Sequence, residues 1–68
     1  MNADIMYDFV VTHKKDLPQA KFKIGESVNY EHEYQNGHGE ILAVADTGDG
    51  IEYAIDGMRY LLWESEIK

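Results

Sequence analysis

The sequence predicts a small all-β domain, an antiparallel barrel of about five strands. Three turn dipeptides fall within 22 residues: Asn36-Gly37, Asp49-Gly50 and Asp56-Gly57. Each suits a tight β-hairpin, because Gly adopts positive φ freely and Asn or Asp tolerates it. Short runs of strand-forming residues lie between and after these pairs, at 40–44, 51–55 and 58–63. Alternating turns and short strands are typical of a small antiparallel sheet.

The N-terminal residues 4–12 fit two structures. Alternate positions hold apolar or aromatic side chains, which favours a strand: Ile5, Tyr7, Phe9 and Val11. A short helix is the alternative, because Asn2 could cap it and Pro18 follows soon after its end. Residues 10–12 are poor helix formers, since their side chains lose χ1 freedom in a helix. We therefore expect an added strand here.

The barrel itself is expected over residues 22–68. A loop at 16–19 precedes it, a short strand is expected at 27–30, and the polar stretch 31–39 should be an exposed loop or hairpin tip. Residues 64–67 fit either a final helical turn or a last strand. With 68 residues and no linker, the chain is expected to form one domain, residues 1–68, in which 1–21 is an N-terminal extension.

Side-chain alternation predicts part of the core. Ile51, Tyr53 and Ile55 share one face of their strand, because successive side chains point to opposite faces. Ile41 and Val44 have opposite parity. Burying both of them therefore requires a β-bulge between them.

A longer pattern carries a family resemblance. It consists of Phe22-x-x-Gly25-x-x-Val28, Gly39-x-Ile41-x-x-Val44, Tyr53-x-Ile55 and Trp63-Glu64-x-x-Ile67. Residues 22–68 thus resemble the SH3-like small-barrel superfamily, which includes Tudor-like and KOW-like domains and many small prophage-encoded domains. The resemblance implies a fold, and a fold does not fix a function. The Lys and Arg residues of the nucleic-acid-binding members are missing here.

Charge is unevenly distributed along the chain. The net charge is −7. Residues 1–23 hold four Lys and three acids, giving +1, whereas residues 24–68 hold ten acids against Arg59 and Lys68, giving −8. Binding to a phosphate backbone depends on clustered Lys and Arg. Direct nucleic-acid binding is therefore disfavoured, although the basic stretch 14–23 keeps it open. Solubility alone would also account for the acid excess.

Several classes of protein find no support. The absence of Cys favours a reducing compartment, so we expect the cytoplasm, and no apolar run approaches the about 20 residues of a membrane span. No nucleophile elbow or phosphate loop is present, so we expect no enzyme and no cofactor. Glu31-His32-Glu33 with His38 is the best metal candidate, but it lacks a fixed ligand spacing, and we expect no metal.

Aromatic and acidic residues predict a protein-binding surface. Tyr and Trp are enriched at interfaces, and the expected contacts are Tyr34, Tyr60 and Trp63, with charge from Glu31, Glu33 and Glu64. Taken singly, Tyr53, Tyr60 and Trp63 are more simply explained as core residues. The predicted function is a non-enzymatic protein–protein interaction module, of a phage- or prophage-type accessory or regulatory kind, that binds a basic partner.

An alternative function follows from the acids alone. Carboxylates on residues 24–68 would mimic DNA phosphates, so the chain would inhibit a nucleic-acid-binding protein. Such binding should weaken steeply with salt, because attraction between exposed charges is screened. Self-association is a further expectation: an exposed edge strand near 4–12 could pair with a second copy.

Overall fold

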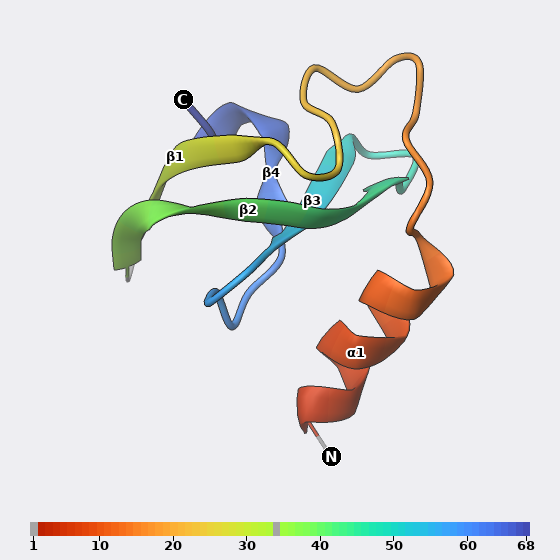
Figure 1. Cartoon of the computed structure of the whole chain (residues 1–68), viewed down its shortest axis with the longest axis horizontal. Coiled ribbons are helices and arrows are strands. Elements are labelled where there is room, and N and C mark those ends of the chain that lie inside the picture. The colour runs from red at the N-terminus through yellow and green to blue at the C-terminus, as the bar shows by residue number, and fades with distance from the viewer. Residues whose placement is uncertain (1, 34) are drawn as a thin grey trace.

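The chain folds into a curled antiparallel half-barrel with one helix beside it (Figure 1). This computed structural model describes the backbone of residues 2–33 and 35–68 and the side chains of residues 7–33 and 35–68. Its elements are α1 (Asn2–Thr12), β1 (Ser27–His32), β2 (Gln35–Asp46), β3 (Ile51–Ile55), β4 (Leu62–Trp63) and the 3-10 helix η1 (Glu64–Glu66). The strands form one sheet in the order β1-β2-β3-β4. The prediction of a mostly β, antiparallel, barrel-like sheet is confirmed.

Strand β2 gives the sheet its curl. Its first half pairs with β1 and its second half with β3, and the register shifts between Ile41 and Ala43. Ile41 and Val44 are both buried, with 0% and 1% of their surface exposed. The predicted bulge is therefore confirmed: one extra residue turns both side chains toward the core and bends the strand.

The C-terminal end of the chain lies against β1. After η1, Ile67 forms an isolated antiparallel bridge with Tyr30, and the backbone N–H of Lys68 donates to the carbonyl of Asn29 over 2.7 Å. The two ends of the strand order are thereby brought together (Figure 1). Residues 64–67 combine the two structures expected for them, a helical turn followed by a bridge.

Asn36-Gly37 is not a turn, which corrects the sequence prediction. Both residues lie within β2, and the β1–β2 register runs on to His32↔Gln35. A Cβ at Gly37 would lie 2.9 Å from the hydroxyl oxygen of Tyr30, so the end of that side chain would have to shift. A Cβ at Gly39 would lie only 2.7 Å from the carbonyl oxygen of Asp56.

The two Asp-Gly pairs do lie in turns, with different geometry from that expected. At the first, the Thr47 N–H donates to the Gly50 carbonyl over 3.0 Å, closing a four-residue loop between β2 and β3. At the second, the Met58 N–H donates to the Ile55 carbonyl over 3.0 Å, and Gly57 has a φ of 84°. Because no described non-Gly residue has a positive φ, this turn is not type I′ and matches type II in its glycine position.

The strand predicted over residues 58–63 is wrong for its first four residues. Only Leu62–Trp63 pair with β3, opposite Tyr53 and Glu52. Met58 is instead buried, with 5% of its surface exposed. The chain therefore rejoins the edge of β3 only at Leu62, and a two-residue hairpin does not form at Asp56-Gly57.

The N-terminal segment is a helix, so the added strand predicted for residues 4–12 is wrong and the helical alternative is right. Phe9 and Val10 are half-buried, and the Phe9 and His13 ring centroids are 4.7 Å apart. The His13 carbonyl accepts a hydrogen bond from the Val44 N–H over 3.1 Å. This docking on β2 outweighs the poor helix propensity of residues 10–12. Residues 4–12 therefore offer no strand edge to a second copy.

The core lies between the curled sheet and the loop that crosses it after α1. Its buried cluster consists of Phe22, Val28, Tyr30, Ile41, Val44, Tyr53, Ile55, Met58, Leu62 and Ile67. Tyr53 and Ile55 are buried as predicted, and Ile51 is half-buried. Ala54 is also fully buried, so β3 is covered on both faces. No helix in the described residues is long and apolar enough to cross a membrane.

Replacing Gly39 with Ala should destabilise the protein by about 1–3 kcal/mol, the usual range for overpacking. The new methyl group would meet the Asp56 carbonyl at 2.7 Å and Ile55 Cγ2 at 2.8 Å. Urea unfolding measures the change. Asn36→Ala is the matched control, because Asn36 is exposed on the same strand. Equal stability of the two variants would contradict the packing role of Gly39.

Candidate protein-binding surface

Two aromatic side chains of the barrel are exposed around β4. Tyr60, in the connection before β4, has 46% of its surface exposed, and Trp63, the last residue of β4, has 41%. The simpler explanation, that they fill the core, does not hold for this pair. Tyr30 and Tyr53 occupy the core instead, with 4% and 0% exposed.

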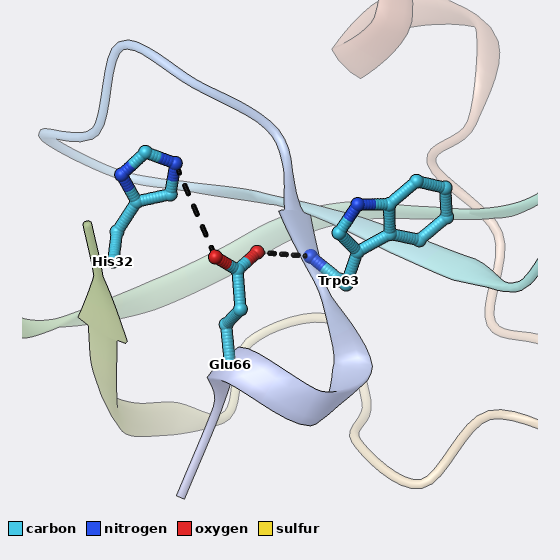
Figure 2. Close-up of polar contacts among 3 residues, drawn as sticks. All are labelled: His32, Trp63 and Glu66. Carbon is cyan, nitrogen blue, oxygen red and sulfur yellow. Dashed lines mark hydrogen bonds and ion pairs between the residues drawn. The ribbon is translucent and has the colours of Figure 1, made fainter. Parts of the chain in front are cut away.

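Tyr60 is held by a residue that sequence analysis did not assign to this surface. Its ring stacks on His32, with centroids 5.2 Å apart and an interplanar angle of 4°. His32 Nε2 lies 4.0 Å from Glu66 Oε2. The other Glu66 oxygen, Oε1, accepts a hydrogen bond from the Trp63 backbone N–H over 2.9 Å (Figure 2). Glu66 thus ties the end of β1 to the start of η1.

The Trp63 indole lies on the side of Glu66 opposite to His32 (Figure 2). A Cβ at Gly50 would lie 3.4 Å from two indole carbons, so the ring covers the β2–β3 turn. Figure 2 shows the indole and the His32 ring on opposite sides of the Glu66 carboxylate. Because Tyr60 stacks on His32, the two exposed aromatic residues flank Glu66 and do not gather into one cage.

The predicted acidic contacts differ in exposure, because Glu31 and Glu33 are exposed whereas Glu64 is half-buried. Glu31 and Glu33 are exposed, and Glu31 Oε2 lies 2.9 Å from Lys68 Nζ. An ion pair this exposed contributes little to stability, so Glu31 remains accessible to a partner. Tyr34 lies outside the described residues.

The half-buried Glu64 belongs to a hydrogen-bond network within the chain. Tyr53, which is fully buried, donates its hydroxyl hydrogen to Glu64 Oε2 over 2.5 Å and accepts a hydrogen bond from the Phe22 N–H over 3.3 Å. The same Glu64 oxygen accepts from the Lys21 N–H over 2.8 Å. A structural role thus accounts for this carboxylate, and its predicted contact with a partner stays a prediction.

The network shifts the pKa values of both side chains. Burial, and then the hydrogen bond to Glu64, raise the pKa of Tyr53 to about 12. The hydrogen bonds from Tyr53 and from the Lys21 backbone lower the pKa of Glu64. The protonated phenol and the ionised carboxylate are the forms that this geometry stabilises.

The histidine and carboxylate residues considered for a metal do not converge. Glu31 is exposed opposite Asn36, His32 is half-buried opposite Gln35, and His38 lies farther along β2, opposite Asn29. Adjacent residues of β1 point to opposite faces of the sheet. In the part of the chain that the structure describes, no group of three or more His, Cys, Asp or Glu side chains could hold a metal ion.

Sequence reasoning found the two exposed aromatic residues but missed His32 and Glu66. A usable signal exists for Glu66, because a Glu three residues after a helix N-cap often reaches back to the N-cap backbone N–H. His32 had no such signal. Its contact with Tyr60 joins positions far apart in the sequence.

Comparison of the chain with protein-family models, with curated proteins and with solved structures finds no match.

Replacing Tyr53 with Phe should destabilise the protein at pH 7 by about 1–3 kcal/mol, because partners of a buried hydroxyl are left unsatisfied. The pKa of Tyr53 is raised from 10.0 to about 12 in the folded chain, so the unfolded chain loses this proton first as pH rises. The stabilisation is complete below pH 10 and is lost as pH rises toward 12. The difference in the free energy of unfolding between the parent and the Tyr53→Phe variant should therefore become smaller above pH 10.

Urea unfolding at pH 7, 10 and 11 tests this expectation on the parent, Tyr53→Phe and Tyr7→Phe. Tyr7 is the control, because 68% of its surface is exposed, and its variant should follow the parent at every pH. A Tyr53→Phe curve that runs parallel to the parent above pH 10 would show that the phenol does not titrate with folding.

Replacing Glu66 with Ala should cost about 1 kcal/mol of stability, the typical effect of losing an N-terminal cap. Glu66→Gln is the matched variant, because an amide oxygen can still accept from the Trp63 N–H, and it should lose less. Trp63 fluorescence, followed during urea unfolding, reports both stability and the surroundings of the indole. Identical losses in the two variants would argue against the cap.

Proposed function

We propose that this chain is a non-enzymatic protein-binding module that recognises a basic partner through Tyr60, Trp63 and the acids around them. One observation carries the proposal. Among the described aromatic residues of 22–68, Tyr60 and Trp63 are exposed while the others are buried. The Tyr60 ring stacks on His32, and the Trp63 indole lies against Gly50 while its main-chain N–H is held by Glu66.

Fixed, exposed aromatic side chains favour binding for two reasons. Tyr and Trp supply large contact areas and dominate the energy of many interfaces. Side chains already held in place lose less conformational entropy when a partner binds. Both rings pack partly on their own chain, yet 46% of Tyr60 and 41% of Trp63 stay exposed, and a partner would cover this remaining surface.

The surroundings of Trp63 support a basic partner. The indole lies over Gly50, which follows the exposed Asp49, and Trp63 pairs with the half-buried Glu52 across the sheet. A Lys or Arg side chain could contact the indole face and a carboxylate together, combining a cation–π interaction with an ion pair. The charge of −8 on residues 24–68 would draw such a partner to the barrel.

We also propose that the barrel is SH3-like. The sequence pattern over residues 22–68 supports this assignment. Further support comes from the order β1-β2-β3-β4 followed by η1 and the Ile67–Tyr30 bridge. On this proposal Ile67–Lys68 form a minimal fifth strand beside β1.

Affinity capture tests the proposed function. A tagged parent chain, incubated with lysate of the native host, identifies partners by mass spectrometry, and the affinity of each purified partner is then measured. Tyr60→Ala/Trp63→Ala should weaken binding at least about tenfold, as expected for hot-spot residues. Tyr7→Ala is the matched control, because Tyr7 is exposed on α1, outside the proposed surface. Undiminished binding by the folded double variant would overturn the assignment.

The DNA-mimic alternative makes a different prediction about salt. Several acids of the barrel are exposed: Glu26, Glu31, Glu33, Glu40, Asp46, Asp49 and Asp56. A partner held by these charges alone should dissociate steeply as salt rises, because exposed charges are screened. An interface anchored by Tyr60 and Trp63 should keep most of its affinity. A titration of the captured complex with NaCl separates the two functions.

A further inference from the structure

The Asn-Gly and Asp-Gly pairs of this chain share a chemical reaction as well as a preference for turns. They are Asn36-Gly37, Asp49-Gly50 and Asp56-Gly57. The main-chain nitrogen of a Gly can attack the side-chain carbonyl carbon of the residue before it, because the Gly has no side chain to hinder the approach. A C–N bond forms, Asn loses ammonia or Asp loses water, and a cyclic succinimide results. Water then opens the ring at either carbonyl carbon, which gives Asp or isoaspartate.

The fold restrains this reaction at Asn36-Gly37. Both residues lie within β2, opposite Glu31 and Tyr30 of β1. The attacking nitrogen must lose its proton, and the main chain must bend around it, and a paired strand opposes both changes. The pairing must therefore open locally before Asn36 reacts.

Asp56-Gly57 is held by main-chain contacts on two sides. The Asp56 N–H donates to the Glu40 carbonyl over 2.9 Å, and the Met58 N–H closes the turn on the Ile55 carbonyl over 3.0 Å. The Asp56 carbonyl oxygen lies 2.7 Å from the position of a Cβ at Gly39, so it packs closely against that glycine. Ring closure at Asp56 would have to disturb these contacts.

Asp49-Gly50 is the least restrained of the three pairs. Asp49 is exposed, in the loop between β2 and β3. The loop is closed through the Gly50 carbonyl, which accepts from the N–H and from the hydroxyl of Thr47 over 3.0 and 3.1 Å. Among the described residues, no hydrogen bond engages the Asp49 carboxylate, the Asp49 main chain or the Gly50 N–H. The two groups that must react are therefore both available.

A modification at this pair would also reach Trp63. A Cβ at Gly50 would lie 3.4 Å from two indole carbons, so the ring lies against this glycine. Isoaspartate lengthens the main chain by one carbon directly before Gly50, because the chain then runs through the former side chain. Gly50 must therefore shift beneath the indole. Trp63 is the only Trp of the chain, so its fluorescence reports this change alone.

We propose that Asp49-Gly50 is a site of spontaneous isoaspartate formation in the folded chain, with Trp63 as its reporter. The Gly50 nitrogen bonds to the Asp49 side-chain carbonyl carbon and water leaves. Addition of water then restores the composition, so the conversion changes no mass and needs no oxidant or co-reactant. This modification does not depend on the function proposed above.

Incubation in water labelled with heavy oxygen measures the reaction at each pair, because every ring opening incorporates one labelled oxygen. Peptide mass spectrometry locates the label, and chromatography separates isoaspartate peptides from Asp peptides. The same chain unfolded in guanidinium gives the rate in the absence of structure. Asp49 should react in the folded chain within about threefold of its unfolded rate, whereas Asn36 and Asp56 should be slowed at least about tenfold, because they must open locally first.

Two variants that keep the charge provide a matched comparison. Asp49→Glu should remove most of the isoaspartate of the folded chain, because Glu would have to close a larger ring, and it should also remove the change in Trp63 emission. Asp56→Glu should keep both. Circular dichroism confirms that the two variants are folded.

Two results would overturn the site. The first is labelling of Asp49 that folding slows as strongly as labelling of Asn36. The second is as much isoaspartate in folded Asp49→Glu as in the parent. Conversion of Asp49 with no change in Trp63 emission would overturn the reporter role of the indole.

Discussion

The buried hydroxyl of Tyr53 is the constraint on which the rest of the structure depends. A polar atom in a core this small must be hydrogen-bonded, because burying it without a partner lowers the stability of the folded chain. Its partners come from two distant segments, Glu64 in η1 and the Phe22 backbone in the crossing loop. Glu64 also accepts from Lys21. These hydrogen bonds hold the loop, β3 and η1 in one arrangement. Helix η1 also carries Glu66, whose carboxylate accepts the hydrogen bond from the exposed Trp63.

The shape of β2 supplies the second constraint. This strand of twelve residues pairs with β1 along its first half and with β3 along its second half. The bulge after Ile41 bends it between the two halves, and glycines before the bulge allow close contacts. At Gly37 the Tyr30 ring takes the space of a side chain, and at Gly39 the end of β3 does so. The glycines and the bulge thus both let β2 depart from a regular strand: the glycines allow a closer approach of other groups, and the bulge bends the backbone.

Among the described side chains, the large exposed apolar ones lie in two parts of the molecule. Tyr60 and Trp63 flank Glu66 at the start of η1, in the acidic part of the chain, whereas Tyr7 and Val11 lie on α1 beside the basic residues. The surface proposed for a basic partner therefore does not include α1.

Local patterns in the sequence determined the features that depend on neighbouring residues alone. The opposite parity of Ile41 and Val44 required a bulge, the period-two pattern of 51–55 marked β3, and the Asp-Gly pairs marked two changes of direction.

Tertiary contacts decided the rest. The His13–Val44 hydrogen bond and the packing of Phe9 made residues 2–12 a helix. Pairing with β1 placed Gly37 within a strand and not in a turn. Hydrogen bonds from Tyr53 and from the Lys21 backbone hold the half-buried Glu64 carboxylate. The contact of His32 with Tyr60 likewise joins segments far apart in the sequence. Propensity and periodicity report only the influence of residues nearby in the sequence. Each of these outcomes depended on a group that is distant in the sequence and comes into contact only when the chain folds.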